Sequence, residues 1–151
     1  AASIFELSAN NPESGNFLID NFYLGNSIYY NNTYQGAKVD KVMLQKADTA
    51  FGNVITASPE TFDAIIFRAR TNKLMENDDM MAKYYQEYID AITAKGPEEV
   101  TKNKAKLVEA YNNIASHFAN FDKPKAKEFL NKTLAVDPTN AYALEAIKLL
   151  K

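Results

Sequence analysis

The sequence predicts an all-α fold, an α-solenoid of about three helix-turn-helix pairs with flanking helices at both ends. Three observations support this. The 151 residues include only 5 Gly and 5 Pro, and Ala, Lys, Leu and Glu are frequent, a composition that favours helices. Apolar residues recur at intervals of three and four, which is the helical period. Prolines spaced 47, 38 and 41 residues apart end successive helical stretches: Pro12, Pro59, Pro97 and Pro138.

Residues 1–12 are expected to form the end of an upstream repeat. The stretch Ala2–Asn11 reads as the second helix of a pair and is closed by Pro12. Without its partner helix, it would leave an apolar patch exposed around Ala2–Leu7. Because the chain begins with Ala1 rather than Met, we expect that an N-terminal segment has been removed, together with any targeting signal it carried.

Residues 16–59 are expected to form the first complete helix pair. Its first helix contains "YLGNSIYY", in which Leu24, Gly25 and Ile28 mark one face. Its second helix contains "KADTAFGNVITASP", in which Ala47 and Phe51 are four residues apart. Between them, residues 31–41 are an insertion, "NNTYQGAKVDK", of about ten residues relative to the expected pair. This insertion lengthens the turn of the pair.

Residues 60–97 are expected to form the second pair. The first helix has an apolar stripe that includes Ile65 and Ile66, and the second helix has one that includes Tyr85 and Tyr88. Arg68 occupies a position where the stripe calls for Leu. The register of this pair therefore remains open by one residue.

Residues 98–138 are expected to form the third pair, the clearest of the three. Its first helix carries an i, i+3, i+4, i+7 stripe, and "NFDKP" breaks it before the second helix. Small residues at Ala115 and Ala126 would let the two helices approach closely. Residues 139–151 are expected to form a capping helix over the last apolar face. The stripe residues of the pair are Tyr111, Ile114, Ala115 and Phe118, then Ala126, Leu130, Thr133 and Leu134.

These motifs resemble the tetratricopeptide repeat (TPR), whose pattern is aromatic-x2-Leu-Gly-x2-Tyr, then Ala-x3-Phe, then Pro. The match uses Leu24-Gly25 and Ala47-x3-Phe51 in the first pair, and Ala126-x3-Leu130 in the third. The residue patterns of the segments "FRARTN" and "AKYYQEYI" also resemble those of multi-repeat proteins of Bacteroidetes. The resemblance implies a C-terminal fragment of such a protein, with a periplasmic or envelope location favoured over a cytoplasmic one.

The TPR resemblance implies a concave groove, lined by the first helix of each pair, that binds a peptide or protein. In TPR proteins that clamp a carboxylate, a Lys lies on the first helix, and Phe22 replaces it here. Arg70 is expected in the groove, while Arg68 pairs with acids nearby. The implied groove residues are Phe22, Asn26, Tyr29, Ile66, Arg70, Lys73, Asn112 and Ser116.

Several other function classes find no support in the residues. The net charge of −2 and the pI of about 5.5 give no electrostatic footprint for nucleic acid. The absence of Cys and the single His117 exclude the usual zinc sites and leave little for catalysis. The acidic stretch Glu76–Asp79 lacks the turn Gly of a calcium loop. We expect no cofactor, no enzyme activity and no membrane span.

Two functional hypotheses remain. The first is a non-catalytic protein-protein interaction module that binds its partner in the groove. The second is a structural spacer that packs against missing N-terminal repeats or self-associates. Exposed Tyr side chains at residues 29, 30 and 34 would favour the first hypothesis, because Tyr suits interfaces.

Overall fold

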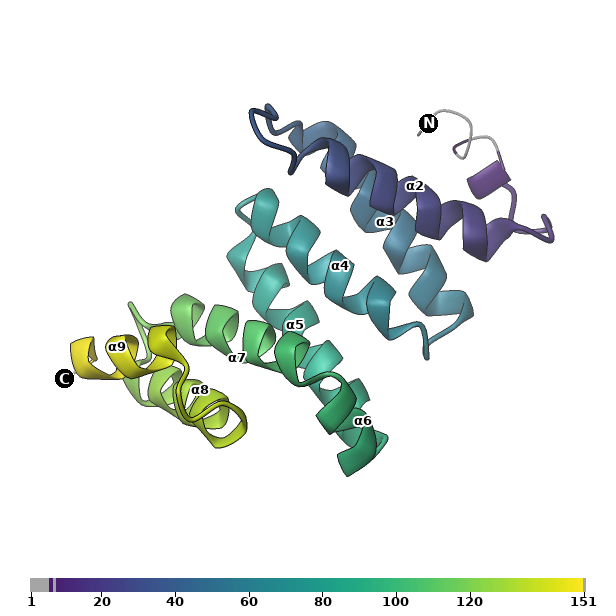
Figure 1. The fold of residues 1–151 in the computed structure, drawn as a ribbon. Helices are drawn as coiled ribbons and strands as arrows, with labels where there is room; N and C mark the ends of the chain where they lie inside the picture. Colours follow the sequence, from purple (N-terminus) through teal and green to yellow (C-terminus); the bar gives the residue numbers. More distant parts are fainter. Residues whose placement is uncertain (1–5, 7, 151) are drawn as a thin grey trace. The chain divides into compact units, whose positions relative to one another are not determined.

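Helices make up the regular secondary structure of the part of the chain described by the computed structural model, which comprises residue 6 and residues 8–150 (Figure 1). The chain divides into unit one (residues 1–81) and unit two (residues 82–151), and this boundary lies inside α5. The helices are α2 (Phe17–Asn31), α3 (Lys41–Ala57), α4 (Phe62–Leu74), α5 (Asp78–Ala94), α6 (Pro97–Lys102), α7 (Lys104–Phe118), α8 (Lys123–Val136) and α9 (Ala141–Leu149).

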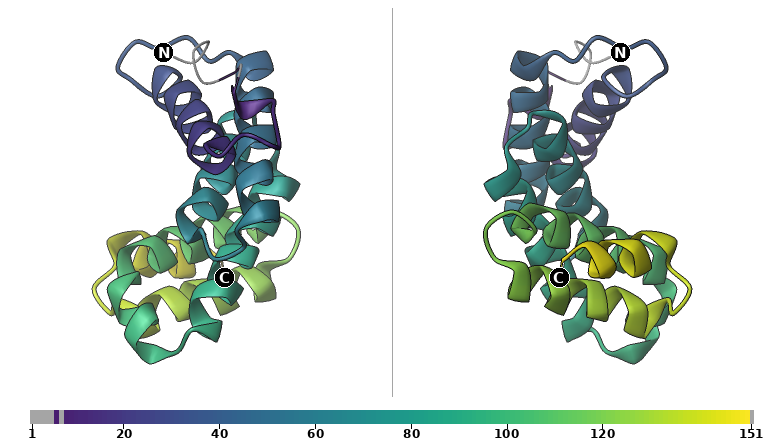
Figure 2. Two further views of the ribbon diagram at one scale, coloured as in Figure 1. Left: turned by 90° about the vertical axis from the view of Figure 1, so that its right-hand side faces the viewer. Right: turned by 90° about the vertical axis from the view of Figure 1, so that its left-hand side faces the viewer.

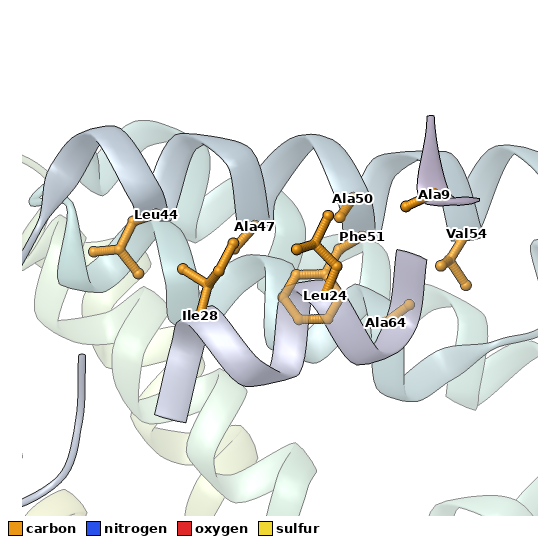
Figure 3. Close-up of a cluster of buried hydrophobic side chains, with 9 residues drawn as sticks. All are labelled: Ala9, Leu24, Ile28, Leu44, Ala47, Ala50, Phe51, Val54 and Ala64. Carbon is orange, nitrogen blue, oxygen red and sulfur yellow. The ribbon is translucent and has the colours of Figure 1, made fainter. Parts of the chain in front are cut away.

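The core of unit one lies where α2 packs against α3 and α3 packs against α4. Figure 3 shows its apolar side chains meeting between the helices. Gly25 lets the backbone of α2 lie close to the Phe51 ring of α3, because a Cβ at this position would lie 2.6 Å from Cε1 and Cζ of Phe51. The ring of Phe51 is completely buried. The Leu-Gly and Ala-x3-Phe motifs of the first pair therefore meet in space. The core residues are Ala9, Leu24, Ile28, Leu44, Ala47, Ala50, Phe51, Val54 and Ala64.

Residues 32–40 connect α2 to α3, and two polar side chains fasten this loop at both ends. The buried Asn32 donates its side-chain amide to the carbonyl oxygen of Ile28 (2.9 Å) and accepts from the backbone N–H of Asp40 (2.6 Å). The Asp40 side chain in turn caps α3 by accepting from the N–H groups of Val42 and Met43. The insertion is therefore anchored to both helices of the pair.

A polar network joins α3 to α4. Arg68 donates through Nε and Nη2 to the two carboxylate oxygens of Asp48, at 3.0 and 3.1 Å. Asn72 donates to the same carboxylate at 2.6 Å. Gly52 leaves room for the guanidinium, because a Cβ there would lie 3.1 Å from Nη1 of Arg68. The Arg at a position where the repeat pattern calls for Leu is thus explained by a partner acid on the preceding helix.

In unit two, α7 packs against α8 and α8 against α9, as the views in Figure 2 allow the reader to follow. The predicted small residues Ala115 and Ala126 are both buried in this unit, and the rings of Tyr111 and Phe129 lie 6.4 Å apart. Asp122 caps α8 by accepting from the backbone N–H of Lys125. The observed break spans residues 119–122, so Lys123 and Pro124 of the break predicted at residues 120–124 already belong to the first turn of α8.

The first helix expected in the third pair is interrupted. A short helix, α6, ends before Asn103, and α7 begins at Lys104. The Asn103 side chain donates to the carbonyl oxygen of Glu99 at 2.9 Å and accepts from the hydroxyl of Tyr88 at 3.3 Å. These bonds hold Asn103 at the junction, in a conformation outside the helical region (φ −105°, ψ 19°).

Half of the expected upstream helix, Ala2–Asn11, and all but Glu6 of the apolar patch expected around Ala2–Leu7 lie outside the residues that the structure describes. Among the described ones, Ala9 is buried in the core of unit one. Its carbonyl oxygen accepts a 3.0 Å hydrogen bond from the side chain of Asn21 on α2. Glu6 pairs with Lys46 of α3 at 2.7 Å. The chain before α2 is thus tied to the α2–α3 pair.

Candidate partner-binding surface

A row of apolar side chains lies on the surface of α2 opposite its core face. Ile19, Tyr23 and Tyr30 follow helical spacing, and Tyr34 continues the row just after the helix. Their exposed fractions are 56%, 53%, 58% and 63%. We call these four residues the aromatic stripe. Clustered exposed apolar side chains of this size are typical of an interaction surface.

Half-buried aromatic rings beneath the stripe hold part of it in place. Phe67 of α4 packs against Tyr29 at 5.3 Å and against Tyr30 at 5.9 Å between ring centroids. Tyr29 and Tyr30 are themselves 5.4 Å apart. Phe22 lies 6.4 Å from Phe67 on the same side. Edge-to-face contacts of this kind restrict the orientation of the rings, so the packing of Tyr30 against Tyr29 and Phe67 holds the exposed Tyr30 ring in place.

The polar groups beside the stripe include one acceptor that lacks a donor. The Oδ1 atom of Asn26, on α2 between Tyr23 and Tyr30, is buried and accepts no hydrogen bond from any described residue. A buried acceptor without a donor costs free energy. Arg70 places its guanidinium 5.1 Å from the centre of the Phe67 ring.

A hollow of about 320 Å³ lies at the N-terminal end of the stripe. It is formed by the first two turns of α2, the end of α3 and the residue that precedes α4. Apolar side chains dominate it, which is typical of a site for an apolar group. The lining residues are Leu18, Ile19, Phe22, Tyr23, Val54 and Thr61.

The structure brings together most of the groove residues expected in unit one, with one correction. Phe22 and Tyr29 are half-buried in the ring cluster, and Arg70 lies over Phe67 of that cluster. Lys73 is exposed in the last turn of α4. Ile66 is completely buried and does not line an exposed surface, so its assignment to the groove was wrong. Its neighbour Phe67 carries the aromatic contact instead.

In unit two, Asn112 and Ser116 differ in accessibility. Ser116 is exposed on α7. Asn112 is half-buried, and its side chain accepts from the hydroxyl of Thr133 at 2.7 Å and donates to Asn140 at 3.3 Å. Asn140 caps α9 by accepting from the N–H of Ala143. Asn112 therefore links three helices of the unit, a structural role that sequence alone did not indicate.

Sequence reasoning missed Ile19 and Tyr23 as surface residues. Their spacing, with Asn26 and Tyr30, is i, i+4, i+7 and i+11, a second stripe opposite the core stripe of Leu24 and Ile28. That signal was present in the sequence. When a helix is apolar on two opposite faces, one face can pack in the core of its own unit and the other stays exposed and can contact another molecule.

Besides the largely buried Arg68–Asp48 pair, several charged side chains of the described residues form ion pairs at the surface. The Lys41 ammonium bonds to Glu76 and lowers the pKa of that carboxyl, and Lys132 lowers the pKa of Glu128 in the same way. Within the described part of the chain, no cluster of three or more His, Asp or Glu residues could hold a metal ion. No described helix is both long enough and apolar enough to cross a membrane.

Comparison with known proteins supports the fold. No family model matches the sequence, and no curated protein matches it. The chain is similar to a crystal structure of the C-terminal part of a TPR repeat-containing protein from Cytophaga hutchinsonii, with 22% identity and a TM-score of 0.61. The match covers 97% of this chain and 65% of that one. The predicted TPR-like, all-helical fold is confirmed, and the similar structure comes from a member of the Bacteroidetes.

Proposed function

We propose that this chain is a non-catalytic interaction module and that unit one binds a protein or peptide partner on the aromatic stripe. The observation that carries the proposal is the exposure of Ile19, Tyr23 and Tyr30 on the face of α2 opposite its core, and of Tyr34 just after the helix. Tyr supplies a large contact area with few rotatable bonds, and it is enriched at interface hot spots. TPR-like helix pairs are known to build surfaces for protein partners, which agrees with this assignment.

The polar neighbours of the stripe suggest how a partner would be oriented. Arg70 and Lys73 on α4 would contact acceptors or carboxylates of the partner beside the stripe. Phe22 and Tyr29 would contribute their exposed edges. In unit two, Ser116 is the accessible member of the expected groove residues.

The test is affinity capture from a lysate of the source organism with three baits. The first is the wild type. The second is Tyr23→Ser/Tyr30→Ser/Tyr34→Ser, which removes the stripe's rings. The third is a matched control that changes exposed apolar residues of α9 in unit two, as Tyr142→Ser/Leu144→Ser/Leu149→Ser.

All three baits are first shown to have the same helicity by circular dichroism. A protein retained by the wild type and the α9 control, but lost by the stripe variant, supports the proposal. Retention of the same proteins by all three baits contradicts it.

A structural role is the second candidate, and the surface of α9 favours it. Tyr142, Leu144 and Leu149 are all exposed, Leu149 to 82%. A terminal helix of a repeat array usually presents a polar outer face. Packing against a further repeat or a second copy would bury these side chains. Concentration-dependent dimerisation in sedimentation velocity, abolished by the α9 variant and unaffected by the stripe variant, would support this role.

A further inference from the structure

We propose that a second hollow of unit one, on the exposed face of α3, binds an extended, uncharged peptide segment through its main-chain groups. This hollow has a volume of about 650 Å³ and lies between α3, α2 and the chain before α2. We call it the α3 hollow. None of the described residues that line it belongs to the aromatic stripe, so this inference goes beyond the proposed function and does not depend on it.

A row of three polar side chains runs along α3 in the hollow. Gln45, Thr49 and Asn53 are four residues apart, so they fall on one face of the helix. Gln45 and Thr49 are exposed, and Asn53 is half-buried. The hydrogen bonds that these side chains make within the protein determine which of their atoms a ligand can use.

Thr49 and Asn53 have donors in use and keep acceptors. The Thr49 hydroxyl donates to the carbonyl oxygen of Gln45 at 3.1 Å, and Nδ2 of Asn53 donates to Oδ1 of Asn21 at 3.0 Å. Asn21 is buried and donates to two backbone carbonyl oxygens, which fixes its amide and thereby orients Asn53. The Gln45 side chain makes no hydrogen bond to a described residue and can both donate and accept.

The spacing of this row matches an extended peptide. Residues four apart in a helix lie about 6 Å apart along its axis, and slightly further apart along the row, which is inclined to the axis. In an extended chain, N–H groups that point to the same edge are two residues, or about 6.5–7 Å, apart. Alternate N–H groups of one peptide can therefore reach Thr49 and Asn53 in turn. A helical partner would use its N–H groups internally and could not donate to both.

The charged residues around the hollow favour an uncharged segment. Lys41 and Lys46 line it, and each is paired with a carboxylate, Lys41 with Glu76 and Lys46 with Glu6. These pairs leave little net charge to attract an acidic or a basic ligand. Recognition would therefore rest on main-chain hydrogen bonds rather than on ion pairs.

Apolar side chains complete the lining. Leu24 of α2 and Ala50 of α3, both drawn in Figure 3, are buried at the hollow, and Val42 is exposed near the start of α3. Side chains of an extended segment alternate between its two faces. Those on one face can therefore pack against these apolar residues while the main chain pairs with the polar row.

The experiment selects peptides from a random dodecapeptide library displayed on phage, with the full chain as bait. Phages that bind the variant Gln45→Leu/Thr49→Val are removed first, so the retained peptides depend on the polar row. These substitutions remove polar atoms at nearly constant shape. The retained peptides are synthesised, and their affinities are measured by fluorescence anisotropy. We expect the double variant to bind them roughly tenfold more weakly than the wild type.

The matched control makes the same two changes outside the hollow, as Gln35→Leu/Thr56→Val. Gln35 is exposed in the loop between α2 and α3. Thr56 is exposed on α3 and, like Thr49, donates its hydroxyl to the carbonyl oxygen four residues earlier. Both variants are first shown to have the helicity and the Tm of the wild type. The control and the stripe variant should bind the retained peptides like the wild type.

N-methylation of the peptide tests main-chain recognition. Each N–H group of the best peptide is replaced in turn by N–CH₃. Because an extended segment presents alternate N–H groups to one edge, affinity should fall about fivefold at every second residue of the bound stretch and hardly change between. Affinity should also stay constant as NaCl rises from about 50 to about 300 mM, because the bonds are uncharged.

Three outcomes would overturn the inference. The first is a loss of affinity at consecutive residues of the peptide, or at none. The second is a strong fall of affinity with salt, which would show that charged side chains recognise the peptide. The third is that no peptide with measurable affinity is retained, or that the control weakens binding as much as Gln45→Leu/Thr49→Val. None of these outcomes bears on the aromatic stripe, which is tested by capture with the stripe variant.

Discussion

Replacing Gly25 by Ala tests whether the close contact between α2 and α3 determines the stability of unit one. The new Cβ would lie 2.6 Å from Cε1 and Cζ of the buried Phe51 ring and 2.9 Å from Cε2. To restore an ordinary contact of about 3.4 Å, the ring or the helix must move by about 0.8 Å. Overpacking of this kind costs about 1–3 kcal/mol, and a clash with three ring atoms in a tight core belongs at the upper end.

The same substitution also has an effect that raises the free energy of unfolding. Ala is better than Gly in a helix by about 1 kcal/mol. The expected net loss for Gly25→Ala is therefore about 2 kcal/mol in the free energy of unfolding, or roughly 4–8 °C in Tm for a chain of this length. Urea denaturation followed by circular dichroism measures the first quantity, and a thermal melt measures the second.

The same substitution is also made in a variant that lacks the Phe51 ring. Phe51→Leu removes the three ring atoms that clash, so Gly25→Ala made in that background should stabilise the protein by about 0.5–1 kcal/mol. Gly52→Ala is the control, because its nearest neighbour is the side-chain end of Arg68 at 3.1 Å rather than a buried ring. The reasoning is refuted if Gly25→Ala raises the free energy of unfolding of the wild type, or lowers it equally in the wild type and in Phe51→Leu. Contact with the Phe51 ring would then not limit how closely α2 and α3 pack.

Three further changes test other parts of the fold. Arg68→Met leaves the carboxylate of Asp48, mostly buried, without its bidentate partner and should cost about 2–4 kcal/mol in urea denaturation, more than the double variant Asp48→Leu/Arg68→Met. Ala126→Glu places a charge at a completely buried position and should cost several kcal/mol; a melt identical to that of the wild type would show that the pairing of α7 with α8 is wrong. Lys132→Ala should raise the lowered pKa of Glu128 toward its ordinary value in an NMR titration; because the folded pKa is depressed, the stability from this pair is present above about pH 4 and is lost as the pH falls through the lowered value.

The sequence predicted those features that depend on short-range pattern. The Leu24-Gly25 and Ala47-x3-Phe51 motifs identified the two helices that meet in unit one, because they match the repeat pattern. The close approach of Gly25 to the Phe51 ring is visible only in the structure. The pairing of Arg68 with Asp48 could not be read in this way. It joins residues twenty positions apart on different helices, and its space depends on Gly52.

The candidate site was predicted less completely than the fold. A one-residue ambiguity of register placed Ile66 in the groove, although Ile66 is buried and Phe67 faces the rings of α2. Adjacent helical residues differ by about 100° in direction, so a small error of register exchanges a core residue for a surface one. Asn112 was assigned from its place in the repeat, whereas its hydrogen bonds to Thr133 and Asn140 become visible only in three dimensions.

Photo-crosslinking can detect a partner that contacts the outward face of α2. Benzoylphenylalanine is placed at Tyr23 in the stripe and, as a control, at Tyr142 on α9, where the side chain is similarly exposed. Each protein is irradiated in a lysate of the source organism, and the products are identified by mass spectrometry. We expect a distinct crosslinked protein at position 23 that is absent at position 142 and lost when Tyr30→Ser/Tyr34→Ser is added. The same products at both positions, or none at position 23, would contradict this expectation.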